Sequence, residues 1–71
     1  MLIAHTDTPT ANGTRAGRVE LNFIEHAPHQ WVTGWRGRDG DKFDSSWCWG
    51  HYFENETEAR DDYRKQVARG Y

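Results

Sequence analysis

Residues 45–69 decide the fold, and they read SSWCWGHYFENETEARDDYRKQVAR. Up to Phe53, large side chains recur at every second position, which is the period of a β-strand. From Asn55 onward, the apolar residues recur at helical spacing. The stretch therefore predicts a strand over residues 45–53 that leads directly into a helix over residues 55–69. The side chains expected on one face of the strand are Trp47, Trp49, His51 and Phe53.

Signals at both ends support the predicted helix. Asn55 is a favoured N-cap residue, and Glu58 follows three positions later, as in a capping box. Gly70 is the predicted C′ residue that ends the helix. Two pairs of opposite charge have the favourable i,i+4 order: Glu56–Arg60 and Asp61–Lys65. The apolar stripe expected to face the sheet consists of Ala59, Tyr63 and Val67.

A second strand is predicted nearer the start of the chain. Residues 18–25 alternate between apolar and polar side chains, with Val19, Leu21 and Phe23 on one face. That alternation is typical of a strand that buries one face and leaves the other in water. Pro28 has no backbone N–H to donate, so we expect the strand to end before it.

The strand between these two is predicted at residues 30–36, where Trp31, Thr33 and Trp35 share one face. A turn-forming run follows at residues 37–41, and its Asp39-Gly40 pair is a hairpin signal. We therefore expect this strand to pair antiparallel with the strand that follows the turn.

Together the segments predict an α+β fold of the β-β-β-α kind, in which a three-stranded antiparallel sheet packs against one C-terminal helix. A short apolar run at the start of the chain offers a fourth strand. Small polar residues around Asn12 and Gly13 predict a flexible loop after it. We expect this strand and loop to occupy residues 1–17, and the single sheet-plus-helix domain to occupy residues 18–71.

Composition restricts what 71 residues can do. A chain of this size buries only about 60% of its unfolded surface, which leaves little of it for a catalytic cleft. One cysteine excludes an intrachain disulfide, and the start of the chain has no features of a signal peptide. No apolar run approaches the roughly 18 residues of a membrane span. We therefore expect a cytoplasmic protein that is not an enzyme and does not contact a membrane.

The charge is unevenly distributed. The net charge of −2 divides into +1 for residues 1–38 and −3 for residues 39–71. The isoelectric point is about 6.0, whereas a dedicated nucleic-acid-binding domain usually has a value above about 9 or a dense basic stripe. This balance favours a protein partner over a nucleic acid.

The junction of the last strand and the helix nevertheless resembles a DNA-binding family. Its pattern is Trp49-x3-Phe53-x4-Glu58-Ala59-x3-Tyr63. It is similar to the end of the plant AP2/ERF domain, and the predicted layout also resembles the arm-binding domains of tyrosine recombinases. The resemblance implies a sheet that enters the major groove, with contacts from strand arginines and tryptophans. The residues that would take this part are Arg18, Arg36, Trp31 and Trp35. The chain departs from the pattern in its acidic balance and in the lack of basic residues on its third strand.

Histidine and cysteine occur as two pairs, His26-x2-His29 and Cys48-x2-His51, whose gaps suit a tetrahedral zinc site. On a regular strand, however, Cys48 and His51 point to opposite faces, because an offset of three is odd. Cys48 also has no cation or helix N-terminus beside it in the sequence to activate it as a nucleophile. We expect no metal, no other cofactor and no catalytic residue.

The aromatic residues are the most informative feature. The helical stripe is too narrow to bury all of them, so we expect at least one tryptophan to stay partly exposed beside Arg36 or Arg38. We also expect Phe53 and Tyr63 to share the core, and Gly50 to leave room for a neighbouring ring. Tryptophan and arginine are enriched where proteins bind one another most tightly. The predicted binding surface adjoins the edge of the third strand and comprises Trp31, Trp35, Arg36, Arg38 and Trp47.

These features predict a small non-enzymatic protein-binding module, an adaptor or an inhibitor. Small proteins that phages and plasmids direct at host proteins often have this profile. A DNA-binding module that uses the face of the sheet is the alternative, and a metal-stabilised domain and an enzyme are further classes that the sequence leaves open. The oligomeric state also stays open.

Overall fold

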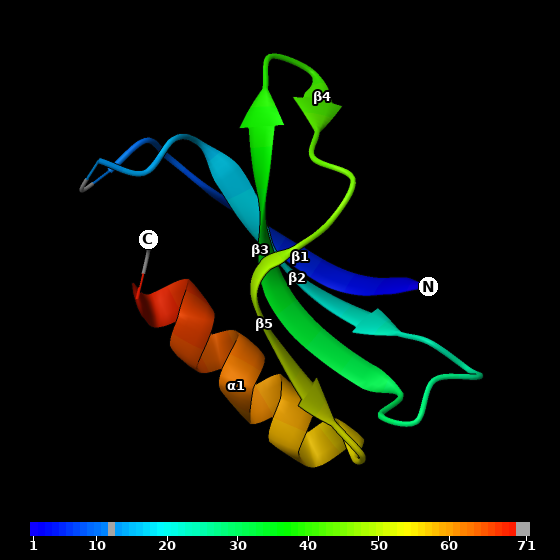
Figure 1. Ribbon diagram of the computed structural model, residues 1–71. Helices are drawn as coiled ribbons and strands as arrows, with labels where there is room; N and C mark the ends of the chain where they lie inside the picture. The colour runs from blue at the N-terminus through cyan, green and yellow to red at the C-terminus, as the bar shows by residue number, and fades with distance from the viewer. Residues whose placement is uncertain (12, 70–71) are drawn as a thin grey trace.

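The computed structural model describes residues 1–11 and 13–69 (Figure 1). Its strands and helix are β1 (Leu2–Thr8), β2 (Gly17–Phe23), β3 (Trp31–Asp39), β4 (Lys42–Phe43), β5 (Cys48–Phe53) and α1 (Glu56–Arg69). All strand pairs are antiparallel; β2 lies between β1 and β3, and the far side of β3 pairs with both β4 and β5. The α+β prediction is confirmed. Asn12 and Gly70, to which a turn and a helix end were assigned, lie outside the described residues.

The N-terminal segment belongs to the sheet. Strand β1 pairs with β2 from Leu2, opposite Asn22, to Thr8, opposite Gly17. The backbone N–H of Phe23 also donates to the carbonyl of Met1 at 2.8 Å. The fourth strand that the first residues offered is therefore present, and it forms one edge of the sheet.

The hairpin after β3 is tighter than predicted. Strand β3 extends to Asp39 instead of ending at Arg36, and Asp39 pairs with Lys42 across a two-residue loop. Gly40 is the first loop residue and has φ 59°, which is the glycine position of a type II′ turn. The chain then leaves the edge of β3, passes over the sheet through residues 44–47, and returns to the same edge of β3 as strand β5 (Figure 1).

Helix α1 begins as the capping pattern predicts. The backbone N–H of Glu58 donates to Oδ1 of Asn55 at 2.9 Å. Glu56 and Arg60 form the expected ion pair, whereas Asp61 pairs with Arg64 at i,i+3. Within residues 1–11 and 13–69, α1 is the single helix, and it is too short and too polar to cross a membrane.

Helix α1 covers one face of the sheet (Figure 1). Val19 and Trp35 are paired on adjacent strands and form the core, and Tyr63 and Val67 pack against them. Ala59 is fully buried, so the predicted stripe does face the sheet. Tyr63 packs on this central cluster, whereas Phe53 lies at the end of β5 beside the first turns of α1.

The opposite face of β2 is also covered, contrary to the expectation of a half-buried strand. Glu20 and Asn22 are 2% and 8% exposed. Part of the cover over Glu20 comes from Trp47, which lies over Gly34: a Cβ atom on Gly34 would stand 2.9 Å from that of Trp47. Gly34, rather than Gly50, thus makes room for Trp47, and Gly17 does the same for the ring of Trp35. A Cβ on Gly50 would make only ordinary contacts, with its nearest atoms at 3.8 Å.

The predicted alternation of the last strand is wrong at its start. Strand β5 begins at Cys48, and its pairing with β3 shifts between Thr33 and Trp35. Trp49 has φ 54°, an unusual backbone conformation for a bulky residue. Across this irregularity the chain reverses the expected facing. Trp47 lies on the face of the sheet opposite α1, called the open face below, where it contacts Glu20. Trp49 lies on the helix side, 5.3 Å from Trp35.

Candidate binding surface

The five predicted surface residues do not form one surface. Trp35 is 3% exposed and its indole N–H donates to Oγ1 of Thr8 at 2.9 Å, so Trp35 belongs to the core. Trp31 lies on the same side of the sheet, 4.9 Å from the ring of Phe23. Arg36, Arg38 and Trp47 lie on the opposite, open face. Burial of Trp35 follows from its pairing with Val19 directly beneath α1.

A buried carboxylate organises the open face. Glu20 accepts hydrogen bonds from Nε of Arg18 at 2.6 Å, Nε of Arg36 at 3.1 Å, Nε1 of Trp47 at 2.8 Å and Nδ2 of Asn22 at 3.0 Å. Strands β2 and β3 place the two arginines opposite each other in the ladder. One carboxylate therefore engages both guanidinium groups.

The same contacts keep Glu20 ionised. Burial alone would raise its pKa, but the hydrogen bonds from Trp47, Asn22 and Arg18 and the charge of Arg36 outweigh burial and hold the pKa below its ordinary value. A buried charge is tolerated where it is paired and hydrogen-bonded in this way. Two arginines against one carboxylate leave a single positive charge on this cluster.

Aromatic rings hold the two arginines from a second direction. The guanidinium of Arg18 lies 4.0 Å from the ring centroid of Phe43, and that of Arg36 lies 5.2 Å from the ring centroid of Trp47. These are cation–π distances. Trp47 is half-buried, which confirms the expected partly exposed tryptophan beside Arg36. Each arginine is thus held by the Glu20 carboxylate on one side and by an aromatic ring on the other.

The edge strand β5 carries two exposed aromatic side chains. Among the described residues it pairs with β3 alone. Trp49 and Tyr52 are 53% and 59% exposed, and Cys48 is exposed beside them. The sequence CWGHYF contains neither Pro nor any Asp, Glu, Lys or Arg, the residues with which proteins commonly protect an open edge. Sequence reasoning placed the binding surface next to the edge of this strand but omitted Trp49 and Tyr52, because alternation alone does not show which side chains stay exposed.

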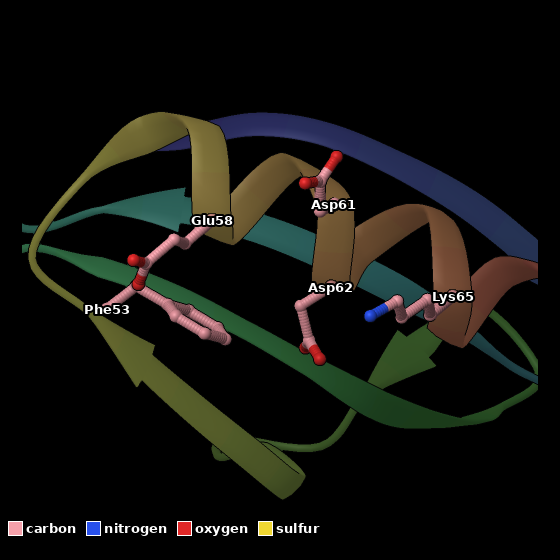
Figure 2. Close-up of a pocket in the computed structure, with 5 residues that line it drawn as sticks. All are labelled: Phe53, Glu58, Asp61, Asp62 and Lys65. Carbon is pink, nitrogen blue, oxygen red and sulfur yellow. The ribbon is translucent and has the colours of Figure 1, made fainter.

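A shallow pocket lies between β5 and α1 (Figure 2). Its lining consists of Phe53, Glu58, Asp61, Asp62 and Lys65. Figure 2 shows Glu58 and Asp62 extending from α1 toward β5, whereas the side chain of Asp61 points away from β5. Three carboxylates and one amine give the pocket an acidic character.

Asp62 joins this pocket to a polar cluster beneath α1. Its Oδ2 accepts hydrogen bonds from Oγ1 of Thr33 and from Nε2 of Gln66, and it lies 2.9 Å from Nδ1 of His51. Burial would raise the pKa of Asp62, but the hydrogen bonds from Thr33, Gln66 and His51 and the His51 charge together lower it. The contact orients the imidazole with Nδ1 toward the helix. The cluster thereby ties β3, β5 and α1 together.

The cysteine and histidines of the candidate zinc pattern do not come together in the fold. His51 is turned toward Asp62, Cys48 is exposed, and the side chain of His26 is 93% exposed in its loop. Within residues 1–11 and 13–69, no three His, Cys, Asp or Glu side chains gather closely enough to hold a metal ion.

Comparisons with known protein families, with curated proteins and with solved structures returned no match to this chain.

Proposed function

We propose that this protein is a small, non-enzymatic protein-binding module of the cytoplasm, an adaptor or an inhibitor that acts by occupying a surface of another protein. The observation that carries the proposal is the β5 edge. There, two large aromatic side chains, Trp49 and Tyr52, are more than half exposed on a strand with an open side. Exposed aromatic surface of this kind is typical of protein interfaces.

The charges on the open face support a protein partner over DNA. Arg18 and Arg36 already neutralise Glu20 and stack on aromatic rings. Contacts to DNA phosphates are made by cations that release counterions on binding. Here one of the two charges is compensated within the fold, and residues 39–71 carry a charge of −3.

DNA binding through the open face is the second candidate. The observation that favours it is the position of Arg18 and Arg36, together with Arg38, on the face of the sheet opposite α1. Arg18 and Arg36 are two of the four residues named by the resemblance to AP2/ERF and recombinase arm-binding domains; the other two, Trp31 and Trp35, lie on the helix side. A DNA ligand would engage Arg38 and the single uncompensated charge of the Glu20 cluster.

The test is capture of partners from the source cells with the wild-type protein and two variants. Tyr52→Ser removes an exposed ring of β5, and Arg60→Ala is the control, because it removes only an exposed ion pair on α1. A partner that Arg60→Ala retains and Tyr52→Ser loses supports the proposal. A gel shift of mixed duplex DNA that weakens steeply with salt and is lost in Arg38→Ala would establish the alternative instead.

A further inference from the structure

The unpaired side of β5 is a template for another strand. The regular part of this side spans residues 50–53, about 13 Å of extended chain, where alternate residues direct their N–H and C=O groups outward. The other edge strand, β1, carries Asp7, and its pairing is irregular between Leu2 and Ala4; charges and bulges of that kind discourage a further strand. β5 has an irregularity only at its start, near Trp49. Residues 50–53 therefore form the more accessible edge.

Aromatic side chains flank this edge on both faces. Tyr52 is opposite Val32 on the open face of the sheet, and Trp49 stands beside Trp35 on the helix face. The side chains of an added strand would alternate between these two faces. Each face would thus bury apolar surface against one exposed ring, as occurs when an extended peptide joins a sheet.

The pocket beside β5 adds a charge preference. Phe53 is the last residue of the strand and lines the pocket with Glu58, Asp61 and Asp62. The lining also includes Lys65, so its three carboxylates outnumber one amine. A lysine or arginine side chain has an aliphatic stem that suits the Phe53 ring and a cationic end that suits the carboxylates.

We propose, on the basis of the protein-binding function above, that the partner supplies an extended, basic segment that pairs with β5 as an added strand and inserts a lysine or arginine side chain between Phe53 and the carboxylates of α1. Main-chain hydrogen bonds to β5 provide a sequence-independent part of the affinity. The acidic pocket provides the specificity for a cation at one position of the segment.

A second copy of this chain fits the edge less well. If β5 of another copy paired with β5, the added strand would be CWGHYF, which contains no Lys or Arg to place in the pocket. Strand β1 of another copy, LIAHTDT, contains none either and brings Asp7. The charge of the pocket therefore selects a different, basic chain as occupant.

The test uses a library of random twelve-residue peptides displayed on phage and selected on the immobilised full-length protein. The expected result is enrichment of β-forming sequences with a lysine or arginine at one recurrent position. With an enriched peptide added, amide chemical shifts should change at residues 48–53 and in the pocket-lining part of α1. In the double variant Glu58→Gln/Asp61→Asn, affinity should fall about tenfold; the matched control is Glu56→Gln, which removes a charge of the same helix outside the pocket.

Other outcomes overturn the inference and separate it from the proposed function. Enriched peptides without a basic residue, or equal affinity for the double variant, would refute the role of the pocket. Shift changes confined to the open face around Arg36, or no enrichment at all, would refute strand addition at β5. A dimer in sedimentation that Tyr52→Ser dissociates would make a second copy the occupant. In each case a captured protein partner lost in Tyr52→Ser would still support the proposed function, whereas loss of no partner would refute both.

Discussion

At the scale of single residues, Glu20 is buried where the alternation of its strand predicts an exposed side chain. An alternating strand places it on the polar face, yet it is 2% exposed and engages four side chains. Replacing a carboxylate in such a cluster leaves donors without an acceptor, and a lost hydrogen bond to a charged group is worth about 1.5–3 kcal/mol. The open face therefore depends on one ionised residue.

The pH dependence of stability should report this directly. Glu20 and Asp62 have folded-state pKa values below the ordinary 4.5 and 3.8, and on unfolding the pKa values return to the ordinary range. The unfolded chain then binds protons at a higher pH than the folded one. The stabilising contribution is thus complete above about pH 5 and is lost as the pH falls through the folded-state values. Thermal unfolding between pH 7 and pH 2 should show this decline, and Glu20→Gln should make it shallower. An equally steep decline in Glu20→Gln would show that other carboxylates cause it.

At the scale of elements, the crossing segment between β4 and β5 depends on a glycine of the strand beneath it. Gly34 lies on β3 directly under Trp47. The missing side chain allows the indole to reach Glu20 and to lie beside Arg36.

Gly34→Ala should therefore displace Trp47. The new Cβ would stand 2.9 Å from Cβ and 3.1 Å from Cγ of Trp47, neither of which is the far end of a flexible side chain. We expect a loss of about 1–3 kcal/mol, as for other overpacked sites, and a red-shifted tryptophan emission. Gly50→Ala is the matched control, because its Cβ would meet its nearest neighbours at 3.8 Å. Equal stability of the two alanine variants in urea would show that Trp47 moves aside at no cost.

Docking of α1 depends on Tyr63. Its ring packs on the Val19 and Trp35 cluster, and its hydroxyl forms a 2.6 Å hydrogen bond with Oγ1 of Thr6. Tyr63→Ala should reduce the free energy of unfolding by about 2–4 kcal/mol, as other large truncations in a core do. Tyr52→Ala, which truncates a tyrosine that is 59% exposed, should change it by less than about 0.5 kcal/mol. Similar losses in the two variants would mean that Tyr63 does not hold the helix.

At the scale of the whole molecule, β1 contributes to the core as well as to the edge of the sheet. Thr8 accepts the indole hydrogen bond of Trp35, and Thr6 bonds to Tyr63. Val19 and Leu21 of β2 are both fully buried, and they pair with Thr6 and Ala4 of β1. The first strand thus connects to the centre of the molecule and to its helix.

Deletion of residues 1–9 should consequently unfold the chain. The deletion exposes the ladder edge of β2 and leaves the buried indole N–H of Trp35 without its acceptor, and a domain of this size has little stability in reserve. We expect the amide spectrum of the truncated protein to collapse to the narrow dispersion of an unfolded chain. A dispersed spectrum for residues 10–71 would instead support an independent domain that begins near residue 18.

The sequence by itself determined the features that depend on neighbours a few residues away. Asn55 caps α1 through a hydrogen bond to a residue three positions later. Val19 and Leu21, at alternate positions of β2, are both buried in the core, and Gly40 forms the turn of the β3–β4 hairpin. Each is set by backbone conformation and by the period of apolar side chains, which are readable in a short window.

Only the tertiary structure decided which surfaces remain for binding. Glu20 and Trp47 are 27 residues apart, and their contact depends on where the segment between β4 and β5 crosses the sheet. The irregularity at Trp49 places Trp47 and Trp49 on opposite faces, which strict alternation does not allow. The return of the chain to the far side of β3 leaves Trp49 and Tyr52 of β5 more than half exposed. These outcomes depend on the pairing of distant segments, whose balance of packing, hydrogen bonding and chain entropy has no local signature.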